Sequence, residues 1–252
     1  MNADKLQRQR FENKYVIDED RALAIRDFTS SFMQLDEYGA NQPNYSYPVH
    51  SLYLDSPDLK LVQSTINGDR NRFKLRIRFY ENMGDAPVYF EIKRRHNSVI
   101  AKKRAAVRRS AAAMVVAGQI SGPDILATDD LYHQQALDEF TRLRSQLNAG
   151  PVAHVTYLRE AWAGFDGQNL ARLTMDRQVF TEPCRTVDFN PQLDNPVKIF
   201  GNKVILELKF TNRYPHWFRD LIQIFDLRQG PAAKYVDGIT LLGEHRFQMA
   251  YI

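Results

Sequence analysis

The chain has 252 residues, of which 44% are apolar and 25% are charged, and this composition excludes a disordered or fibrous protein. Its formal net charge is +4 with a pI of about 9.1, a mild excess that suits a polyanionic partner without identifying one. Cys184 is the only cysteine, which excludes an intrachain disulfide and a multi-cysteine zinc site.

The sequence carries no obvious targeting or membrane segment. No apolar run reaches the roughly 18–20 residues that span a bilayer, and the polar start MNADKLQRQR lacks the apolar stretch of a secretory signal. We therefore expect a cytoplasmic protein with no membrane segment in this chain. Without an internal repeat or a low-complexity linker, residues 1–252 are predicted to form a single domain.

Strands and amphipathic helices alternate irregularly along the chain, which predicts an α+β fold with an antiparallel sheet. Ser56-Pro57 resembles a helix cap followed by proline in the first turn, and Gly150-Pro151 is expected to stop a helix. Strands are predicted at 10–17, 48–54, 72–80, 87–94, 100–108, 152–162, 170–180 and 203–210. Helices are predicted at 19–37, 57–66, 109–118, 130–148 and 215–228.

The segment 72–80 alternates between apolar and cationic residues. Phe73, Leu75, Ile77 and Phe79 share one face of the expected strand, and the opposite face is cationic. For a single strand, a solvated outer face is the ordinary interpretation. The cationic face of this segment comprises Arg72, Lys74, Arg76 and Arg78.

The same alternation recurs on other predicted strands, and cations outnumber acids on the polar faces. Like charges that face each other across strands are destabilising, so a polyanion between the strands explains the pattern better than a random surface. The predicted apolar faces would lie outside, under the helices, and the charged faces inside an eight-stranded barrel. The further charged-face residues are Arg10, Glu12, Lys14, Glu91, Lys93, Lys102, Arg104, Arg159, Arg172, Asp176, Glu207 and Lys209.

The acidic minority on these faces is the candidate metal-binding set. Carboxylate oxygens without cysteine or clustered histidine favour Mg²⁺ or Mn²⁺. Glu207 is the first candidate ligand, with Glu91, Glu12 and Asp176 as weaker ones. For each of them, an ion pair with a neighbouring Lys or Arg is the alternative role.

The chain resembles the VTC (vacuolar transporter chaperone) domain, the polyphosphate-polymerase branch of the triphosphate tunnel metalloenzymes, from Phe11 to about Gly238. Each matching segment is weak alone, but their order and spacing together are specific. The segments are Arg10-Phe-Glu-Asn-Lys-Tyr15, Ser51-Leu-Tyr-Leu-Asp-Ser56, Lys74-Leu-Arg-Ile-Arg78, Glu91-Ile-Lys93, Lys102-Lys-Arg104, Tyr157-Leu-Arg159, Arg172-Leu-Thr-Met-Asp176, Leu206-Glu-Leu-Lys209 and Lys234-Tyr235.

The resemblance implies an eight-stranded antiparallel tunnel with helices outside, and Mn²⁺- or Mg²⁺-dependent transfer of the ATP γ-phosphate onto polyphosphate. Position by position, Glu207 matches the metal-binding glutamate. Lys74, Arg104 and Lys209 face the same way by periodicity. The residues that match phosphate-binding positions of the family are Lys14, Arg76, Arg78, Lys93, Lys102, Arg159, Arg172 and Lys234.

Two departures from the family pattern stand out. Related hydrolytic tunnel enzymes begin with Glu-x-Glu-x-Lys, whereas Arg10 takes the first position here, which favours the polymerase-like branch. A second lysine that the family can carry shortly before Lys234 is replaced by Gly230-Pro231-Ala-Ala233, and Arg228 is a possible substitute.

Together these observations lead to a hypothesis for the function. Arg76, Arg78, Lys93, Arg159 and Arg172 would clamp the triphosphate, since phosphoryl transfer depends on positioning and charge neutralisation. Polyphosphate or pyrophosphate would be the acceptor and would need no general base. The product would pass Lys14, Lys102 and Lys234.

Three other functions remain open from the sequence. A tunnel triphosphatase would use water as the acceptor, and a non-catalytic module would only bind polyphosphate. A nucleic-acid binder is disfavoured, because such sheets carry aromatic residues on the charged face, and here the phenylalanines lie opposite the charges. The expected partners are therefore ATP and inorganic polyphosphate or pyrophosphate, and not a nucleic acid.

Overall fold

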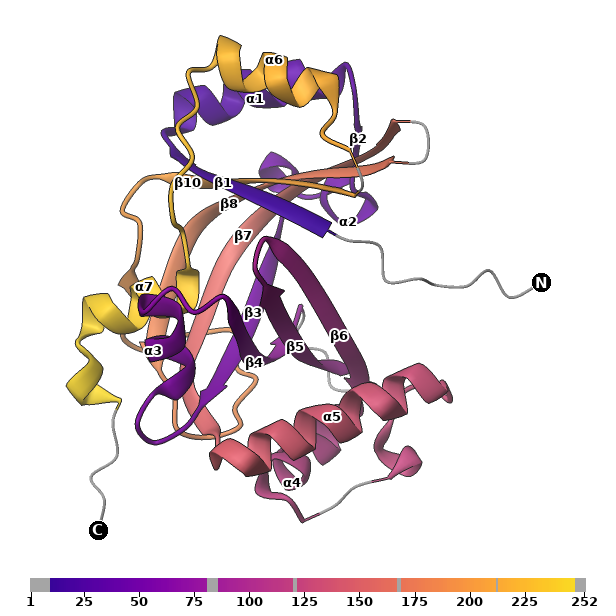
Figure 1. Cartoon of the computed structure of the whole chain (residues 1–252), viewed down its shortest axis with the longest axis vertical. Coiled ribbons are helices and arrows are strands. Elements are labelled where there is room, and N and C mark those ends of the chain that lie inside the picture. Colours follow the sequence, from indigo (N-terminus) through magenta and orange to yellow (C-terminus); the bar gives the residue numbers. More distant parts are fainter. Residues whose placement is uncertain (1–9, 81–85, 120–121, 167–168, 212, 248–252) are drawn as a thin grey trace.

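The computed structural model describes residues 10–80, 86–119, 122–166, 169–211 and 213–247 (Figure 1). The strands are β1 (Arg10–Ile17), β2 (Gln34–Leu35), β3 (Ser46–Asp55), β4 (Asn71–Phe79), β5 (Val88–His96), β6 (Val99–Val107), β7 (Gly150–Asp166), β8 (Asn169–Pro183), β9 (Val197–Lys198) and β10 (Val204–Thr211). The α-helices are α1 (Glu19–Ser30), α2 (Glu37–Ala40), α3 (Lys60–Ile66), α4 (Ala112–Ala117), α5 (Leu131–Leu147), α6 (His216–Ile224) and α7 (Lys234–Leu242).

The strands form one antiparallel sheet in the order β2-β7-β3-β4-β5-β6-β1-β10-β8-β9, with a further pairing between β7 and β8. This arrangement confirms the predicted α+β class. Among the described residues, β1 and β6 share a single residue pair, Arg10 opposite Ile100. The sheet is therefore strongly curved, but it is not a fully hydrogen-bonded closed barrel. The predicted antiparallel sheet is confirmed, and the predicted closed barrel is not.

Alternation of side chains decides which face of each strand is buried. On β4, Leu75, Ile77 and Phe79 are fully buried on the outer face, whereas the cations between them point to the inner face. The same period operates on β5, where Phe90 and Ile92 lie in the outer layer. These two strands thus separate an apolar layer from a charged interior, as the sequence pattern predicts.

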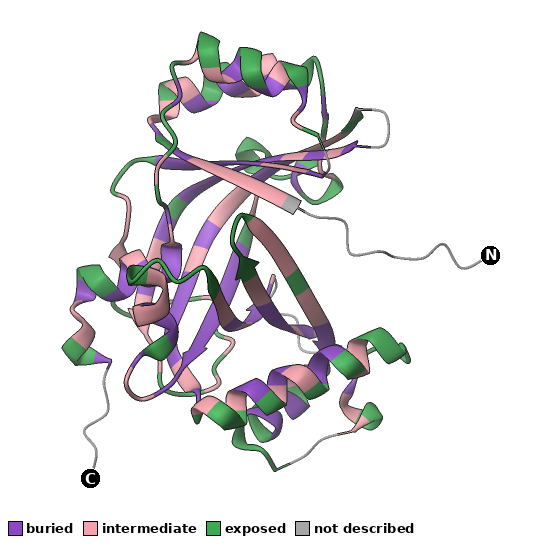
Figure 2. Ribbon diagram, viewed as in Figure 1, coloured by how far each residue is buried: buried purple, intermediate pink, exposed green. Residues whose placement is uncertain are grey.

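The apolar side chains of the sheet and helices gather in three clusters. One lies between β4, β5 and β6 and the helices α4 and α5, with Phe90 against Phe140. A second lies between β3, β7 and α7, and a third between β1, β10, β8 and the helices α1 and α6. Figure 2 shows α1 and α6 exposing one side while the strands beneath them are mostly buried or intermediate.

Helix α7 departs from the prediction that the helices pack outside the sheet. Its Tyr235 stacks on Tyr53 of β3 at a ring-centroid distance of 4.4 Å. Tyr53 lies directly opposite Arg76 of β4 and therefore on the inner face. The N-terminal end of α7 consequently borders the charged interior. The sequence prediction did not include this helix.

Several helix boundaries also differ from the prediction. The first helix ends at Ser30, where the sequence predicts position 37, because a short strand and α2 follow instead. Pro57 does not open α3, which begins at Lys60 after Leu59 in the left-handed region. The carboxylate of Asp55 accepts hydrogen bonds from the amides of Leu61 and Val62 and so caps this helix from the end of β3.

Helix α5 begins and ends close to the predicted positions, whereas α6 begins near its predicted start and ends four residues before the predicted end at 228. The side chain of Asp130 accepts from the amide of Tyr132 at the start of α5, and Asn148 ends it in the left-handed conformation. Helix α6 follows Pro215 and ends at Ile224. None of the helices in the described ranges is both long enough and apolar enough to span a membrane.

Candidate functional site

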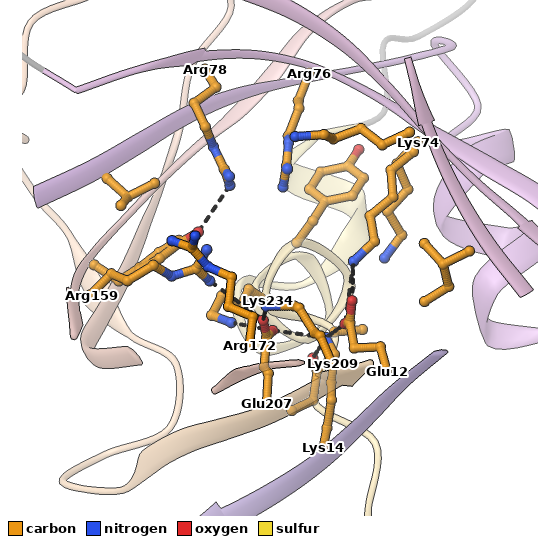
Figure 3. A pocket seen from close by; sticks show the side chains of 18 of the residues that line it. Glu12, Lys14, Lys74, Arg76, Arg78, Arg159, Arg172, Glu207, Lys209 and Lys234 are labelled. Atoms are coloured by element: carbon orange, nitrogen blue, oxygen red, sulfur yellow. Dashed lines mark hydrogen bonds and ion pairs between the residues drawn. The ribbon is translucent and has the colours of Figure 1, made fainter. Parts of the chain in front are cut away.

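The inner faces of the strands enclose a cavity of about 1500 Å³. Fourteen of its lining residues are Lys or Arg and only four are Asp or Glu. Figure 3 shows Lys74, Arg76 and Arg78 pointing into it from one wall toward a cluster around Glu207 on the opposite wall, with α7 behind. The cavity thus presents a large excess of positive charge to its contents.

The structure brings nearly all the predicted site residues to this cavity. Glu207 and Glu12 line it, whereas Glu91 and Asp176 lie in the walls with no exposed surface. The predicted cations that line it are Lys14, Lys74, Arg76, Arg78, Lys93, Lys102, Arg104, Arg159, Arg172, Lys209 and Lys234.

Glu91 fixes the cations of one wall. The guanidinium of Arg76, directly opposite on β4, donates to Glu91 Oε2 through Nε at 2.8 Å and forms an ion pair through Nη2 at 2.7 Å. Lys102 Nζ and Arg104 Nε lie 3.6 and 3.5 Å from Glu91 Oε1. Burial alone would raise the pKa of Glu91, but Arg76 and the other cations hold it far below its usual range. With three cationic neighbours and no exposure, Glu91 has the geometry of an ion-pair partner.

Asp176 has the same role on the other wall. It accepts two hydrogen bonds of 2.7 Å from the guanidinium of Arg159, its partner across the β7–β8 pair, and Lys234 Nζ lies 2.6 Å from Oδ2. Burial opposes ionisation of Asp176, but these two cations outweigh it and lower its pKa. The aspartate therefore orients Arg159 and Lys234 toward the cavity.

Glu207 is the acidic residue most central to the site. Its Oε2 accepts from Lys209 at 2.5 Å and from the hydroxyl of Thr174 at 3.3 Å. Its Oε1 accepts from Lys234 at 3.1 Å, and Lys14 Nζ lies 3.4 Å away. Burial would raise the pKa of Glu207, but the surrounding lysines lower it well below its usual range. The carboxylate is thus ionised and faces four cationic side chains, counting Arg159 at 3.4 Å.

Glu12 and Lys14 continue this cluster along β1. Lys14 Nζ lies 3.4 Å from Glu12 Oε1, and Lys93 Nζ of β5 lies 3.1 Å from Glu12 Oε2. Because β5 and β1 are not paired strands, this ion pair joins separate parts of the wall. Burial lowers the pKa of Lys14, but the neighbouring carboxylates of Glu207 and Glu12 raise it by more. The net pKa is therefore above its usual value, and Lys14 stays charged.

Arg78 has no carboxylate within ion-pair distance among the described residues, although its side chain is buried. Its guanidinium donates to the hydroxyls of Ser51 at 3.3 Å and Tyr157 at 2.9 Å. A buried cation that is held only by hydroxyl groups keeps most of its charge available for an anion. Arg172 differs, since Nη2 donates to Asp36 Oδ2 at 2.7 Å.

Three lysines of the cavity have a lowered pKa, and burial is the main cause for each; for Lys209 it lowers the pKa to about 8 although Glu207 opposes the shift. Burial and the neighbouring cations lower the pKa of Lys74 to about 8, although Tyr53 raises it. For Lys102, burial is again the main cause of a pKa of about 8, and Glu91 only partly opposes it. The pKa of Tyr53 also falls to about 8, because Arg76, Lys74 and Arg78 outweigh its burial. These pKa shifts arise because the side chains are buried in an interior that holds more cations than anions.

Sequence reasoning assigned no role to several residues of the site. Tyr53 accepts a hydrogen bond of 3.2 Å from Arg76, and it shares a strand face with Ser51, which contacts Arg78. Tyr47, Tyr80 and Tyr89 also line the cavity. Arg228 is not among the residues that line the cavity, and its side chain is 88% exposed. It therefore does not substitute for the family lysine that is missing before Lys234.

The oxygen donors in the cavity fit one kind of metal site. In the described part of the chain, no cluster of three or more His, Cys, Asp or Glu residues is placed to hold an ion. Glu207 and Glu12, both 3.4 Å from Lys14 Nζ, supply two neighbouring carboxylates. Mg²⁺ and similar ions often bind through one or two carboxylates, with phosphate oxygens and water as the other ligands. The pair therefore fits a metal ion that arrives with phosphate.

This arrangement is suited to binding an extended chain of phosphate groups. Arginines supply bidentate donors and lysines supply point charges. Walls that are fixed by Glu91 and Asp176 hold those groups without reorganisation when the ligand enters. A phosphoryl group between Arg78 and the opposite wall would contact cations on several sides.

The sequence model of the VTC domain matches residues 9–243 of the chain. No curated protein sequence matches it significantly. Among solved structures, a Bacillus halodurans protein described as a candidate adenylate cyclase has a TM-score of 0.47 and 13% identity, over 88% of this chain and 92% of that one. The PH1819 protein of Pyrococcus horikoshii has a TM-score of 0.44 and 11% identity, over 93% and 96%.

Proposed function

The chain belongs to the VTC domain family, and on that basis we propose that it is a metal-dependent polyphosphate polymerase. It would transfer the γ-phosphate of ATP onto a growing chain of inorganic polyphosphate inside the cavity. The observation that carries the proposal is the excess of fourteen lining cations over four carboxylates, in a cavity with buried walls. An excess of this kind is stabilised by a ligand with many closely spaced negative charges.

The triphosphate is proposed to lie between the two walls. Arg76 and Arg78 would contact it from β4, and Lys93 from β5. Arg159 and Arg172 would contact it from the other side. Asp176 orients Arg159 through two hydrogen bonds, which leaves the remaining guanidinium edge for phosphate oxygens. Lys74, Lys102 and Arg104 would neutralise the phosphates next to this position.

Glu207, with Glu12, would hold the Mn²⁺ or Mg²⁺ ion. The bound ion would neutralise negative charge on the phosphate oxygens during the transfer. Lys14 forms an ion pair with Glu12, and Lys234 forms one with Glu207. Phosphate oxygens offer those lysines alternative partners, so substrate binding would free the carboxylates for the ion.

The transfer itself needs few groups from the protein. An oxygen of the terminal phosphate of the acceptor chain attacks the γ-phosphorus, and a new phosphoanhydride bond forms. The bond from the γ-phosphorus to the β,γ-bridging oxygen breaks, and its electron pair leaves on ADP. The acceptor oxygen is already anionic, so no general base is required. Lys14 and Lys234, on the wall of Glu207, would retain the lengthened chain through their charges.

A product assay tests this proposal. The purified protein is incubated with ATP and Mn²⁺, with and without pyrophosphate, and the products are resolved by gel and by phosphate release. We expect a ladder of long polyphosphate chains that disappears in Glu207→Gln. Release of orthophosphate alone would identify a triphosphatase. Binding of polyphosphate without turnover would identify a non-catalytic binding module.

A further inference from the structure

One end of the cavity carries a group of tyrosines that phosphate binding does not explain. Tyr38 lies 6.0 Å from Tyr47 by ring centroids, Tyr47 lies 6.5 Å from Tyr80, and Tyr80 lies 6.0 Å from Tyr89. All four line the cavity, and we call them the tyrosine rim. Tyr38 comes from α2, Tyr47 from β3, Tyr80 directly follows β4, and Tyr89 comes from β5, so four separate segments converge on one aromatic surface.

We propose that the tyrosine rim binds the base of a nucleotide whose phosphates extend into the cavity. This inference rests on the proposed function, because it assigns a position to the nucleoside of the phosphate donor. Aromatic side chains bind nucleobases by stacking, and each stacked base contributes about 1–3 kcal/mol. The contact is tolerant of base identity, since every base has a π face.

The spacing of side chains along β4 supports the assignment. Tyr80 follows Arg78, Arg76, Lys74 and Arg72 at two-residue intervals, and all five line the cavity. Alternate residues of a strand lie about 6.6–6.8 Å apart on one face. Tyr80 thus lies at one end of a row of cavity-lining side chains, and the other four side chains of this row are cationic. A base at Tyr80 therefore places the attached phosphates near Arg78 and Arg76.

Arg104 joins the rim to the phosphate-binding wall. Its guanidinium carbon lies 3.5 Å from the ring centroid of Tyr89, and Nη2 donates to the Tyr80 hydroxyl at 3.5 Å. The same side chain lies 3.5 Å from Glu91. A cation in this position is within reach of the first phosphate of a nucleotide whose base lies on the rim. Asn41 and Gln42, which follow α2, add exposed amides that can bond to the base or sugar.

Aromatic residues elsewhere in the cavity are less suited to this role. Tyr53 and Tyr235 stack on each other and are only 6% and 1% exposed, whereas the tyrosines of the rim are intermediate or exposed. Phe11 stacks on Phe210 at 5.2 Å, and Phe73 lies beneath Arg94. The wall around these residues is cationic. Lys74 lies opposite Lys93 on β4 and β5, and Arg72 lies opposite Arg95 farther along the same two strands. The two ends of β4 are therefore chemically different, one aromatic and the other cationic.

Binding measurements on two ligands test the inference. The probes are β,γ-imido-ATP, which has a base, and inorganic tripolyphosphate, which has none, each titrated calorimetrically with Mn²⁺ present. In Tyr80→Leu and Tyr47→Leu, we expect the dissociation constant for the nucleotide to rise about 5- to 150-fold, and that for tripolyphosphate to stay within twofold. Tyr80→Phe should retain nucleotide affinity, because it keeps the stacking face. Tyr132→Leu, on α5 outside the cavity, is the matched control.

The outcomes separate the inference from the proposed function. Unchanged affinity for both ligands in the leucine variants overturns the tyrosine rim as a base site but leaves the polymerase proposal intact. Equal losses for both ligands overturn it too, because the tyrosines would then act on the phosphates or on the wall. Wild-type protein that binds neither ligand contradicts the proposed function itself. Thermal unfolding of each variant identifies any loss that results from misfolding.

Discussion

Arg76 of β4 and Glu91 of β5 lie directly opposite each other, and two nitrogens of the guanidinium contact the same carboxylate oxygen, at 2.7 and 2.8 Å. Glu91 has no exposed surface, whereas the side chain of Arg76 is 12% exposed where it lines the cavity. Its position shows that some charged residues of the cavity hold other charged residues in place rather than bind ligand. The consequence for mutagenesis is that Arg76→Ala leaves a buried carboxylate with weaker partners, so its effect combines a loss of function with a loss of stability.

Removing the buried carboxylate should destabilise the fold. We expect Glu91→Gln to lower the free energy of unfolding by about 3–5 kcal/mol, because Arg76 then stays buried without a charged partner. Chemical denaturation in the absence of ligand measures the change. Glu139→Gln is the control, since Glu139 pairs with Arg94 and Lys103 near the surface and should cost about 1 kcal/mol or less. Equal losses in the two variants would contradict the ion-pair role of Glu91.

Arg78 is the cleanest position for testing phosphate binding. We expect Arg78→Gln to reduce turnover about 100- to 1000-fold, as when one preorganised donor is lost from a reacting group. Stability should change little, because the partners of Arg78 are the neutral hydroxyls of Ser51 and Tyr157. Initial rates and thermal unfolding of the same preparation provide both values. Arg142→Gln, at an exposed position of α5, should leave both unchanged.

Glu207 and Asp176 should respond differently to a metal ion. We expect Glu207→Gln to weaken Mn²⁺ binding in the presence of tripolyphosphate at least tenfold, since it removes a proposed ligand. Asp176→Asn should destabilise the protein but leave Mn²⁺ affinity within about twofold, because its oxygens already bind Arg159 and Lys234. Paramagnetic resonance of free Mn²⁺ reports the affinity. An equal loss of affinity in Asp176→Asn would make that residue a ligand as well.

The lysines with a pKa of about 8 predict opposite effects of alkaline pH on binding and stability. Lys74, Lys102 and Lys209 lose their charge as the pH rises through about 8, so tripolyphosphate affinity should fall between pH 7 and 9. In the unfolded chain, lysine keeps its proton up to about 10.4. The unfolded state therefore binds more protons between pH 8 and 10, and the titration of these three lysines makes folding more favourable as the pH rises.

Titration of wild type and of Lys74→Met checks this prediction. Calorimetry at pH 7.0, 8.0 and 9.0 should show a weaker pH dependence of tripolyphosphate affinity in the variant, which lacks one titrating group. In buffers of different ionisation enthalpy, the wild type should take up protons on binding at pH 8.5. Proton release at that pH, or an identical pH dependence in the two proteins, would contradict it.

The charged interior was predictable because a strand reveals both of its faces in the sequence. The alternation of Arg72, Lys74, Arg76 and Arg78 with apolar residues places every one of these cations in the cavity. The distinction between acids that line the cavity and acids within its walls was not predictable. Glu91 and Glu207 both occupy charged faces, and only the register across strands shows that three cations surround Glu91.

Elements whose position depends on distant contacts were also missed. Helix α7 is only nine residues long, and its place on the inner face depends on stacking between Tyr235 and Tyr53, which are far apart in the sequence. The start of α3 was misplaced because Asp55, at the end of β3, caps the helix together with the hydroxyl of Ser56, which accepts from the amide of Lys60, so that the helix begins three residues after Pro57. The tyrosine rim likewise forms from four segments that only the fold brings together.

The division of the apolar residues into three clusters has a consequence for how the molecule opens. Each cluster joins its own helices to a different part of one shared sheet. Cooperative units of this kind can exchange their amide hydrogens separately, with free energies below that of global unfolding. The wall bearing Arg76 and Arg78 belongs to the cluster under α5, whereas the wall bearing Glu207 belongs to that under α1 and α6. Fluctuations on opposite sides of the cavity therefore need not be synchronous, and a ligand that contacts both sides would couple their motions.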